Sequence, residues 1–167
     1  RNSLRLTYDI KLGDQAKITE ISFIGDKIFK NRKLKNVIAS EESIFWKFLS
    51  KNVFLDEKRI NLDKRLLLNY YKNRGYYLAK IENSFIESQE NKSFKLIFNI
   101  NAGEKYTFNN LKLDLPTDFE KKYFLSINKL LLKLKGKPYS LNNINKILKE
   151  VDKIALSKQY EFVNATL

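Results

Sequence analysis

The chain has 167 residues, of which 43% are hydrophobic and 31% charged, a balance typical of a folded globular protein. It contains no Cys and no His, which excludes disulfides, thiolate nucleophiles, the usual zinc sites and histidine acid–base chemistry. The net charge of +13 favours an anionic partner, such as nucleic acid, a lipid surface or an acidic protein. No apolar run approaches the roughly 20 residues that span a membrane. The chain starts at Arg1 without Met or a recognisable signal sequence, so we expect a fragment of a longer protein.

The first strands are indicated by alternation of apolar and polar residues. Residues 3–12 predict a half-buried strand that ends at Gly13. Residues 18–24 predict a second strand, and the residues expected on one of its faces are Thr19, Ile21 and Phe23.

Two helices are expected next. Asn31 is the expected N-cap of a short helix, and Asp56 is the expected N-cap of a longer one that ends before Gly75. Their predicted inner faces, at helical spacing, carry Leu34, Val37 and Ile38 in the first and Ile60, Leu67 and Tyr71 in the second.

A hairpin follows the longer helix. Residues 76–81 predict a strand, residues 88–92 a polar turn, and residues 94–100 an alternating strand that closes at Gly103.

The remaining residues predict strand, helix, helix and strand again. Residues 111–115 alternate up to Pro116, and Thr117 with Glu120 forms an expected capping box for a helix. Ser140 is the expected N-cap of the next helix, and residues 160–167 predict a strand. The expected inner faces of the two helices are Phe124, Ile127, Leu131 and Leu134, and Ile144, Ile147, Leu148, Val151, Ile154 and Ala155.

An internal repeat supports this order. Residues 3–14 align without a gap to residues 93–104, including the terminal glycine and the acid that follows it. A weaker match pairs the two long helices and places Gln159 where the first copy has Gly75, so we expect that helix end to use another cap or a strained residue. The aromatic segment around Trp46 reads as an insertion in the first copy. The repeat predicts an α+β module of order strand–helix–helix–strand–strand, with two helices on one face of a three-stranded sheet.

The module order divides the chain into three parts. We expect residues 1–15 to be the last strand of a preceding module, residues 16–103 a complete module, and residues 104–167 a module that lacks its final strand.

Three motifs in this order resemble the POTRA domain family: residues 18–26, residues 70–76 and residues 98–104. The resemblance implies tandem POTRA modules, each a three-stranded mixed sheet with two helices. Tandem modules of this kind resemble the family of outer-membrane protein assembly factors. That family implies a periplasmic arm on the bacterial outer membrane, in front of a C-terminal β-barrel, which binds unfolded outer membrane proteins and accessory lipoproteins.

The resemblance also implies where binding occurs. In the family's strand order the strand after the second helix lies at a sheet edge, where unpaired backbone groups can accept an added strand. The expected protein-binding edge residues are Tyr77, Ala79, Lys80, Ile81, Glu82, Asn83 and Phe85. A possible docking patch is formed by Phe45, Trp46 and Phe48, although such aromatic residues more often close the end of a core.

Other functions remain as alternatives. The basic residues from Lys27 to Lys35 favour general electrostatic attraction, and a basic nucleic-acid-binding module is the first rival. A POTRA-like structural domain of a cell-division or secretion protein is the second. We expect no nucleic-acid partner, no cofactor and no metal. An enzyme is not expected, because no constellation of side chains has the roles that catalysis needs.

Overall fold

A computed structural model describes residues 16–44, 50–90 and 93–160. Their regular elements, in chain order, are β1 (Lys17–Asp26), α1 (Asn31–Lys35), the 3₁₀ turn η1 (Lys51–Val53), α2 (Glu57–Lys72), β2 (Lys80–Gln89), β3 (Ser93–Asn101), the 3₁₀ turn η3 (Lys121–Phe124), α3 (Leu125–Leu134) and α4 (Leu141–Ser157). The strand predicted at residues 3–12 and the repeat match that includes it lie outside the described residues. So does the strand predicted at 160–167, apart from Tyr160.

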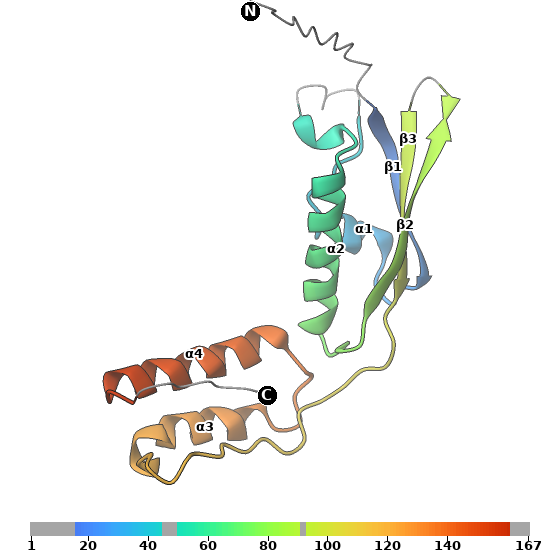
Figure 1. Cartoon of the computed structure of the whole chain (residues 1–167). Helices are drawn as coiled ribbons and strands as arrows, with labels where there is room; N and C mark the ends of the chain where they lie inside the picture. Colours follow the sequence, from blue (N-terminus) through green and yellow to red (C-terminus); the bar gives the residue numbers. More distant parts are fainter. Residues whose placement is uncertain (1–15, 45–49, 91–92, 161–167) are drawn as a thin grey trace, which may run out of the picture.

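The strands form one mixed sheet in the order β1-β3-β2. The central strand β3 runs parallel to β1 and antiparallel to β2. Helices α1 and α2 cover one face of this sheet (Figure 1). The predicted α+β module with a three-stranded mixed sheet and two helices is confirmed.

The core lies between α2 and the helix-facing side of the sheet. Leu96, Phe98 and Ile100 alternate along β3 and are buried, as expected for a strand with one covered face. Leu67 and Tyr71 of α2 are buried against them in the same cluster. Each large apolar side chain buried in this way contributes about 1.5–3 kcal/mol.

The predicted inner face of β1 is wrong at one position. Ile18, Ile21 and Phe23 are buried, whereas Thr19 is exposed. The pairing with β3 shifts register between Ile18 and Glu20, so β1 has one extra residue at this point. A bulge of this kind moves the following side chains to the opposite face of the sheet, which simple alternation does not reveal.

Two of the predicted helix caps are confirmed. The Asp56 carboxylate accepts from the Arg59 N–H at 3.0 Å, and the Ser140 hydroxyl accepts from the Asn143 N–H at 3.3 Å. In both cases the side chain satisfies one of the amides that the first helical turn leaves without a backbone partner.

Two other predicted caps are wrong. Asn31 is the first residue of α1, its Oδ1 accepts from Lys27 Nζ at 2.7 Å, and the capping position is occupied by Lys30. Glu120 precedes η3 without a side-chain capping bond, and its carboxylate pairs instead with Lys122. An ion pair near the chain surface therefore replaces the capping box.

Helices α3 and α4 form a second small core, which lies beyond the C-terminal end of α2 (Figure 1). Residues 111–115, predicted as a strand, have no regular strand structure. Their three leucines nevertheless pack against the core that contains Phe124 and Ile127, so the predicted inward face is present. In the first module β1 is held by β3. Residues 104–160, called the second module below because they hold a separate core, have no counterpart of β3, and a lone segment forms no ladder.

The two modules meet where α2 ends and α4 begins. The Asn73 side-chain oxygen accepts from the Asn142 N–H at 2.7 Å, and so caps the first turn of α4 from the preceding module. The rings of Tyr77 and Tyr139 meet edge to face at 4.9 Å between centroids. The Tyr139 N–H donates to the Tyr106 carbonyl at 2.9 Å. Burial raises the pKa of Tyr139, with a smaller contribution from Tyr77.

The repeat predicts an unusual end for α4, and the structure has it. Gln159 has φ +57°, whereas Gly75 after α2 has φ +102°. A non-glycine residue in this region costs about 1–2 kcal/mol. Gln159→Gly should therefore raise the free energy of unfolding by about 0.5–1 kcal/mol after the entropy cost of glycine, measured by urea denaturation.

The matched opposite change is Gly75→Ala. A Cβ at Gly75 lies 2.7 Å from the Lys105 side chain and 3.2 Å from the Tyr106 carbonyl oxygen, so this variant should lose stability. An unchanged or lowered stability of Gln159→Gly would contradict the strain at this helix end.

The buried Tyr71 predicts a pH dependence of stability. Burial raises the pKa of the Tyr71 phenol, whose O–H donates to the Lys27 carbonyl. The folded state thus favours the neutral phenol. Its contribution is complete below about pH 10 and is lost as the pH rises toward the raised pKa. Tyr71→Phe should lower the free energy of unfolding at pH 7 by about 1–2 kcal/mol and flatten its decline above pH 10.

Urea denaturation between pH 7 and 11 measures this effect. Tyr106→Phe, at a more exposed position, is the control and should keep the alkaline decline. A Tyr71→Phe variant with an unaltered decline would show that another group causes it.

Candidate functional site

Strand β2 (Lys80–Gln89) forms one outer edge of the sheet. It pairs with β3 on one side, and no other described strand lies beside its second side (Figure 1). In a paired strand, alternate backbone N–H and C=O groups point away from the neighbour. The outer side of β2, called the β2 edge below, therefore presents backbone groups that the sheet does not use.

The side chains along the β2 edge are unusually exposed for apolar residues. Phe85 lies opposite Ile97 on the face without helices, and 46% of its surface is exposed. Ile86 lies opposite Leu96 on the helix-facing side, but it is 47% exposed. Adjacent apolar residues thus offer contacts on both faces of an added strand, next to unpaired backbone groups.

Charged residues and an irregularity limit this edge. The pairing of β2 with β3 shifts register between Ile81 and Asn83, so Glu82 is an extra residue in β2. Lys80 and Glu87 are exposed along the same strand. Bulges and charges are common on edge strands and reduce unselective pairing between sheets. The apolar pair Phe85–Ile86 lies between these features, so it is the part of the edge best suited to contact.

The opposite edge of the sheet is covered by the chain itself. On the outer side of β1, the Ile18 carbonyl accepts from the Ser43 N–H at 2.7 Å. At the start of the strand the Ala16 carbonyl accepts from the Leu55 N–H at 2.8 Å. The two edges of this sheet therefore differ in accessibility.

The residues predicted for the edge separate into two groups. Lys80, Ile81, Glu82, Asn83 and Phe85 lie in β2. Tyr77 and Ala79 precede the strand, in a turn that the Ala79 N–H closes on the Tyr76 carbonyl at 3.2 Å. Their assignment to the strand is wrong because this turn after Gly75 delays its start: Tyr77 contacts the second module, and Ala79 is buried in the core.

Two other parts of the prediction have different outcomes. The docking patch of Phe45, Trp46 and Phe48 lies outside the described residues. The sequence also predicts a polar turn at residues 88–92, whereas β2 continues through Gln89. Phe85 and Ile86 are adjacent apolar residues, which a strictly alternating, half-buried strand would not have. This break in the alternation was the available signal for apolar residues on both faces of the strand.

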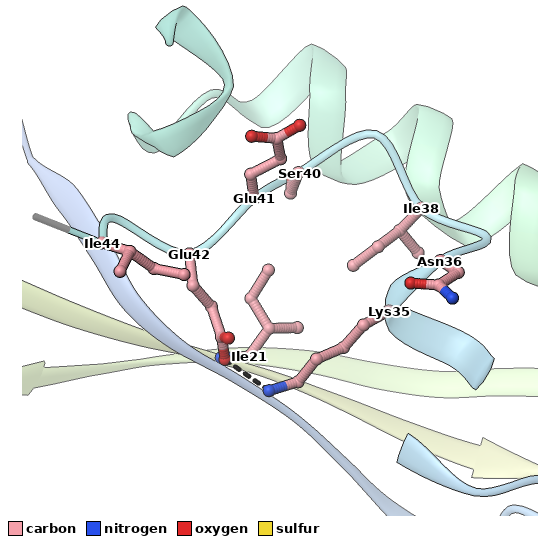
Figure 2. Close-up of a pocket in the computed structure, with 8 residues that line it drawn as sticks. All are labelled: Ile21, Lys35, Asn36, Ile38, Ser40, Glu41, Glu42 and Ile44. Carbon is pink, nitrogen blue, oxygen red and sulfur yellow. Dashed lines mark hydrogen bonds and ion pairs between the residues drawn. The ribbon is translucent and has the colours of Figure 1, made fainter. Parts of the chain in front are cut away.

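A pocket of about 420 Å³ lies between α1, the loop that follows it and β1 (Figure 2). Its charged lining includes Lys35 and Glu42, which form an ion pair across it, and Glu41. The Glu42 carboxylate also accepts from the Ile21 N–H at 2.8 Å. These groups already bind one another, so the pocket is part of the closure of β1 rather than a separate ligand site.

In residues 16–44, 50–90 and 93–160, no cluster of three acidic side chains has the geometry of a metal site. No helix in those ranges is long and apolar enough to cross a membrane. Of the basic residues near α1, Lys27 and Lys35 make specific bonds within the chain, to Phe23 and Glu42 respectively.

Comparison with known proteins identifies a family that matches the module containing the sheet. Residues 16–103 match the family model POTRA, described as a surface antigen variable number repeat. The chain is 25% identical over 163 residues to the outer membrane protein assembly factor BamA of Neisseria meningitidis, covering 97% of this chain and 20% of that protein. It is 27% identical over 108 residues to BamA of Neorickettsia risticii, covering 64% of this chain and 14% of that protein. The chain thus spans a fifth or less of the length of these relatives.

A solved structure has the same fold. The crystal structure of POTRA modules 3–5 of Haemophilus influenzae BamA aligns with a TM-score of 0.60 at 17% identity, covering 86% of this chain and 54% of that one. This likeness concerns the fold. Since the family match extends over residues 16–103 of 167, more than half of the sequence, the chain belongs to the POTRA family.

Proposed function

We propose that this chain is part of the periplasmic arm of a BamA-like outer membrane protein assembly factor, and that its β2 edge binds unfolded outer membrane proteins by strand addition. POTRA modules are not enzymes, so the function rests on binding. The match to the outer membrane protein assembly factor BamA of Neisseria meningitidis covers 97% of this chain, which supports the role in assembly.

The observation that carries the proposal is the asymmetry of the sheet. The outer side of β2 has no described strand beside it and exposes Phe85 and Ile86. The outer side of β1, by contrast, is hydrogen-bonded by Glu42, Ser43 and Leu55. Main-chain pairing provides affinity for any extended segment, and the apolar pair favours segments rich in apolar residues. This combination suits clients that share alternating strands but no common sequence.

The rest of the arm follows from the module order. We place residues 1–15 at the end of a preceding POTRA module and residues 104–167 in a following module without its final strand. Accessory lipoproteins of the assembly machinery are further partners in this proposal. The periplasmic side of the bacterial outer membrane is the corresponding location.

The chain is well suited to a cross-linking test because it has no native Cys. Phe85 and Ile24 lie on the same face of the two outer strands and are 46% and 45% exposed. Phe85→Cys and Ile24→Cys are therefore matched reporters. A synthetic peptide of about ten alternating apolar and polar residues, the length of a membrane-spanning strand, carries an activated disulfide at its centre.

We expect the peptide to react with Phe85→Cys about tenfold faster than with Ile24→Cys, corresponding to a preference of about 1.4 kcal/mol. Mass spectrometry of the mixed disulfide gives both rates. A peptide with N-methyl groups on alternate residues keeps the side chains but loses the edge bonds, and its preference should disappear. Equal rates at the two positions, or an undiminished preference of the N-methylated peptide, would refute strand addition at β2.

A further inference from the structure

Backbone groups at several positions on the outer side of β1 are bound by atoms of the same chain. Ala16 and Ile18 accept from backbone N–H groups, as described above. Beyond the bulge, alternate residues point outward in a new phase: Ile21, Phe23 and Gly25. The Gly25 carbonyl accepts from the Lys27 N–H at 3.0 Å. At the remaining two positions, the Ile21 N–H and the Phe23 carbonyl are bound by charged side chains.

Glu42 binds the outward-pointing N–H of Ile21. Its Oε1 accepts from the Ile21 N–H at 2.8 Å and from the Lys35 ammonium, so one carboxylate oxygen joins α1 to β1 (Figure 2). Hydrogen bonds to a charged group are stronger than neutral ones. A carboxylate here takes the position that the carbonyl of an added strand would need.

Lys27 binds the outward-pointing carbonyl of Phe23, two residues further along β1. Its Nζ donates to the Phe23 carbonyl at 2.8 Å and to Asn31 Oδ1 at 2.7 Å. An ammonium here takes the position that the N–H of an added strand would need. The negative Glu42 thus binds a backbone N–H, and the positive Lys27 binds a backbone carbonyl. Each charge is complementary to the backbone group that it covers.

We propose that Glu42 and Lys27 determine which edge of this sheet accepts a client: they close β1 and direct strand addition to β2. Because side chains rather than a neighbouring strand cover this part of the β1 edge, a single substitution can remove each of these contacts. The specificity rests on the proposed function, whereas the closure itself is a property of the fold that can be measured without a client.

Buried residues of α2 hold the backbone near both side chains. Asp63 is buried, and its Oδ1 accepts from the Ala39 N–H at 2.6 Å and the Ser40 N–H at 3.2 Å, which fixes the loop that leads to Glu42. The buried Tyr71 donates to the Lys27 carbonyl. Helix α2 therefore positions the backbone on both sides of the β1 edge.

The first experiment measures the closure alone. Glu42→Ala removes the acceptor of the Ile21 N–H, so exchange of this amide with solvent, followed by NMR, should accelerate about tenfold or more. Glu42→Gln keeps a side-chain acceptor and should exchange more slowly than Glu42→Ala. The control is Glu41→Ala, which removes the neighbouring carboxylate that accepts from Ser50 Oγ. Unchanged exchange at Ile21 in Glu42→Ala would overturn the proposal.

The second experiment measures the choice of edge. In the Ile24→Cys reporter, Glu42→Ala combined with Lys27→Ala should raise the rate of peptide capture about tenfold. The same substitutions in the Phe85→Cys reporter should leave the rate unchanged. Glu41→Ala with Lys33→Ala makes the same charge changes nearby and should not raise capture at Ile24→Cys. Equal rates for the two double variants there would overturn the role in specificity.

The two proposals fail in different ways. If Phe85→Cys captures no peptide while Ile21 exchange accelerates in Glu42→Ala, strand addition at β2 is refuted and the closure of β1 stands. In that case the edge opened by Glu42→Ala and Lys27→Ala should pair with a second copy of the chain, which sedimentation equilibrium detects. Faster exchange without capture at Ile24→Cys and without self-association would show that the two side chains do not control access.

Discussion

Every open sheet has two edges, and their backbone groups must be paired, covered or left accessible to another chain. In this module the two edges meet the requirement in opposite ways. The outer side of β1 is occupied by backbone atoms, a carboxylate and an ammonium from neighbouring segments. The outer side of β2 has no described strand beside it and exposes adjacent apolar residues. In the proposed function, this asymmetry confines strand addition to one edge of the sheet.

The polar contacts that cover β1 depend on the packing of α2. Leu67 and Tyr71 bury the helix against the sheet, and the same helix carries Asp63, which holds the loop after α1. The loop then brings Glu42 to Ile21. The hydrophobic core thus fixes the helix, the helix fixes the loop, and the loop covers the strand. A charged side chain at the surface is useful here because buried groups have already fixed its backbone.

Features determined by neighbouring residues were predictable from the sequence. Asp56 and Ser140 cap helices that begin just after them, and the repeat shows that Gln159 occupies a glycine position. Features determined by distant residues were not. The bulge near Thr19 follows from the pairing of β1 with β3, and the closure of β1 joins residues 21 positions apart. The turn after Gly75 shifted the start of β2 because its hydrogen bonds and its contact with the second module outweigh the strand propensity of Tyr76 and Tyr77.

The junction between the modules has a mechanical consequence. Tyr77 contacts Tyr139 of the second module, and β2 begins three residues later at Lys80. Asn73, four residues before Tyr77, caps the first turn of α4. The exposed strand and the inter-module contacts are therefore linked in series by a short, tightly hydrogen-bonded turn. A force applied along β2 is therefore transmitted to the second module through this turn, which is too short to extend much.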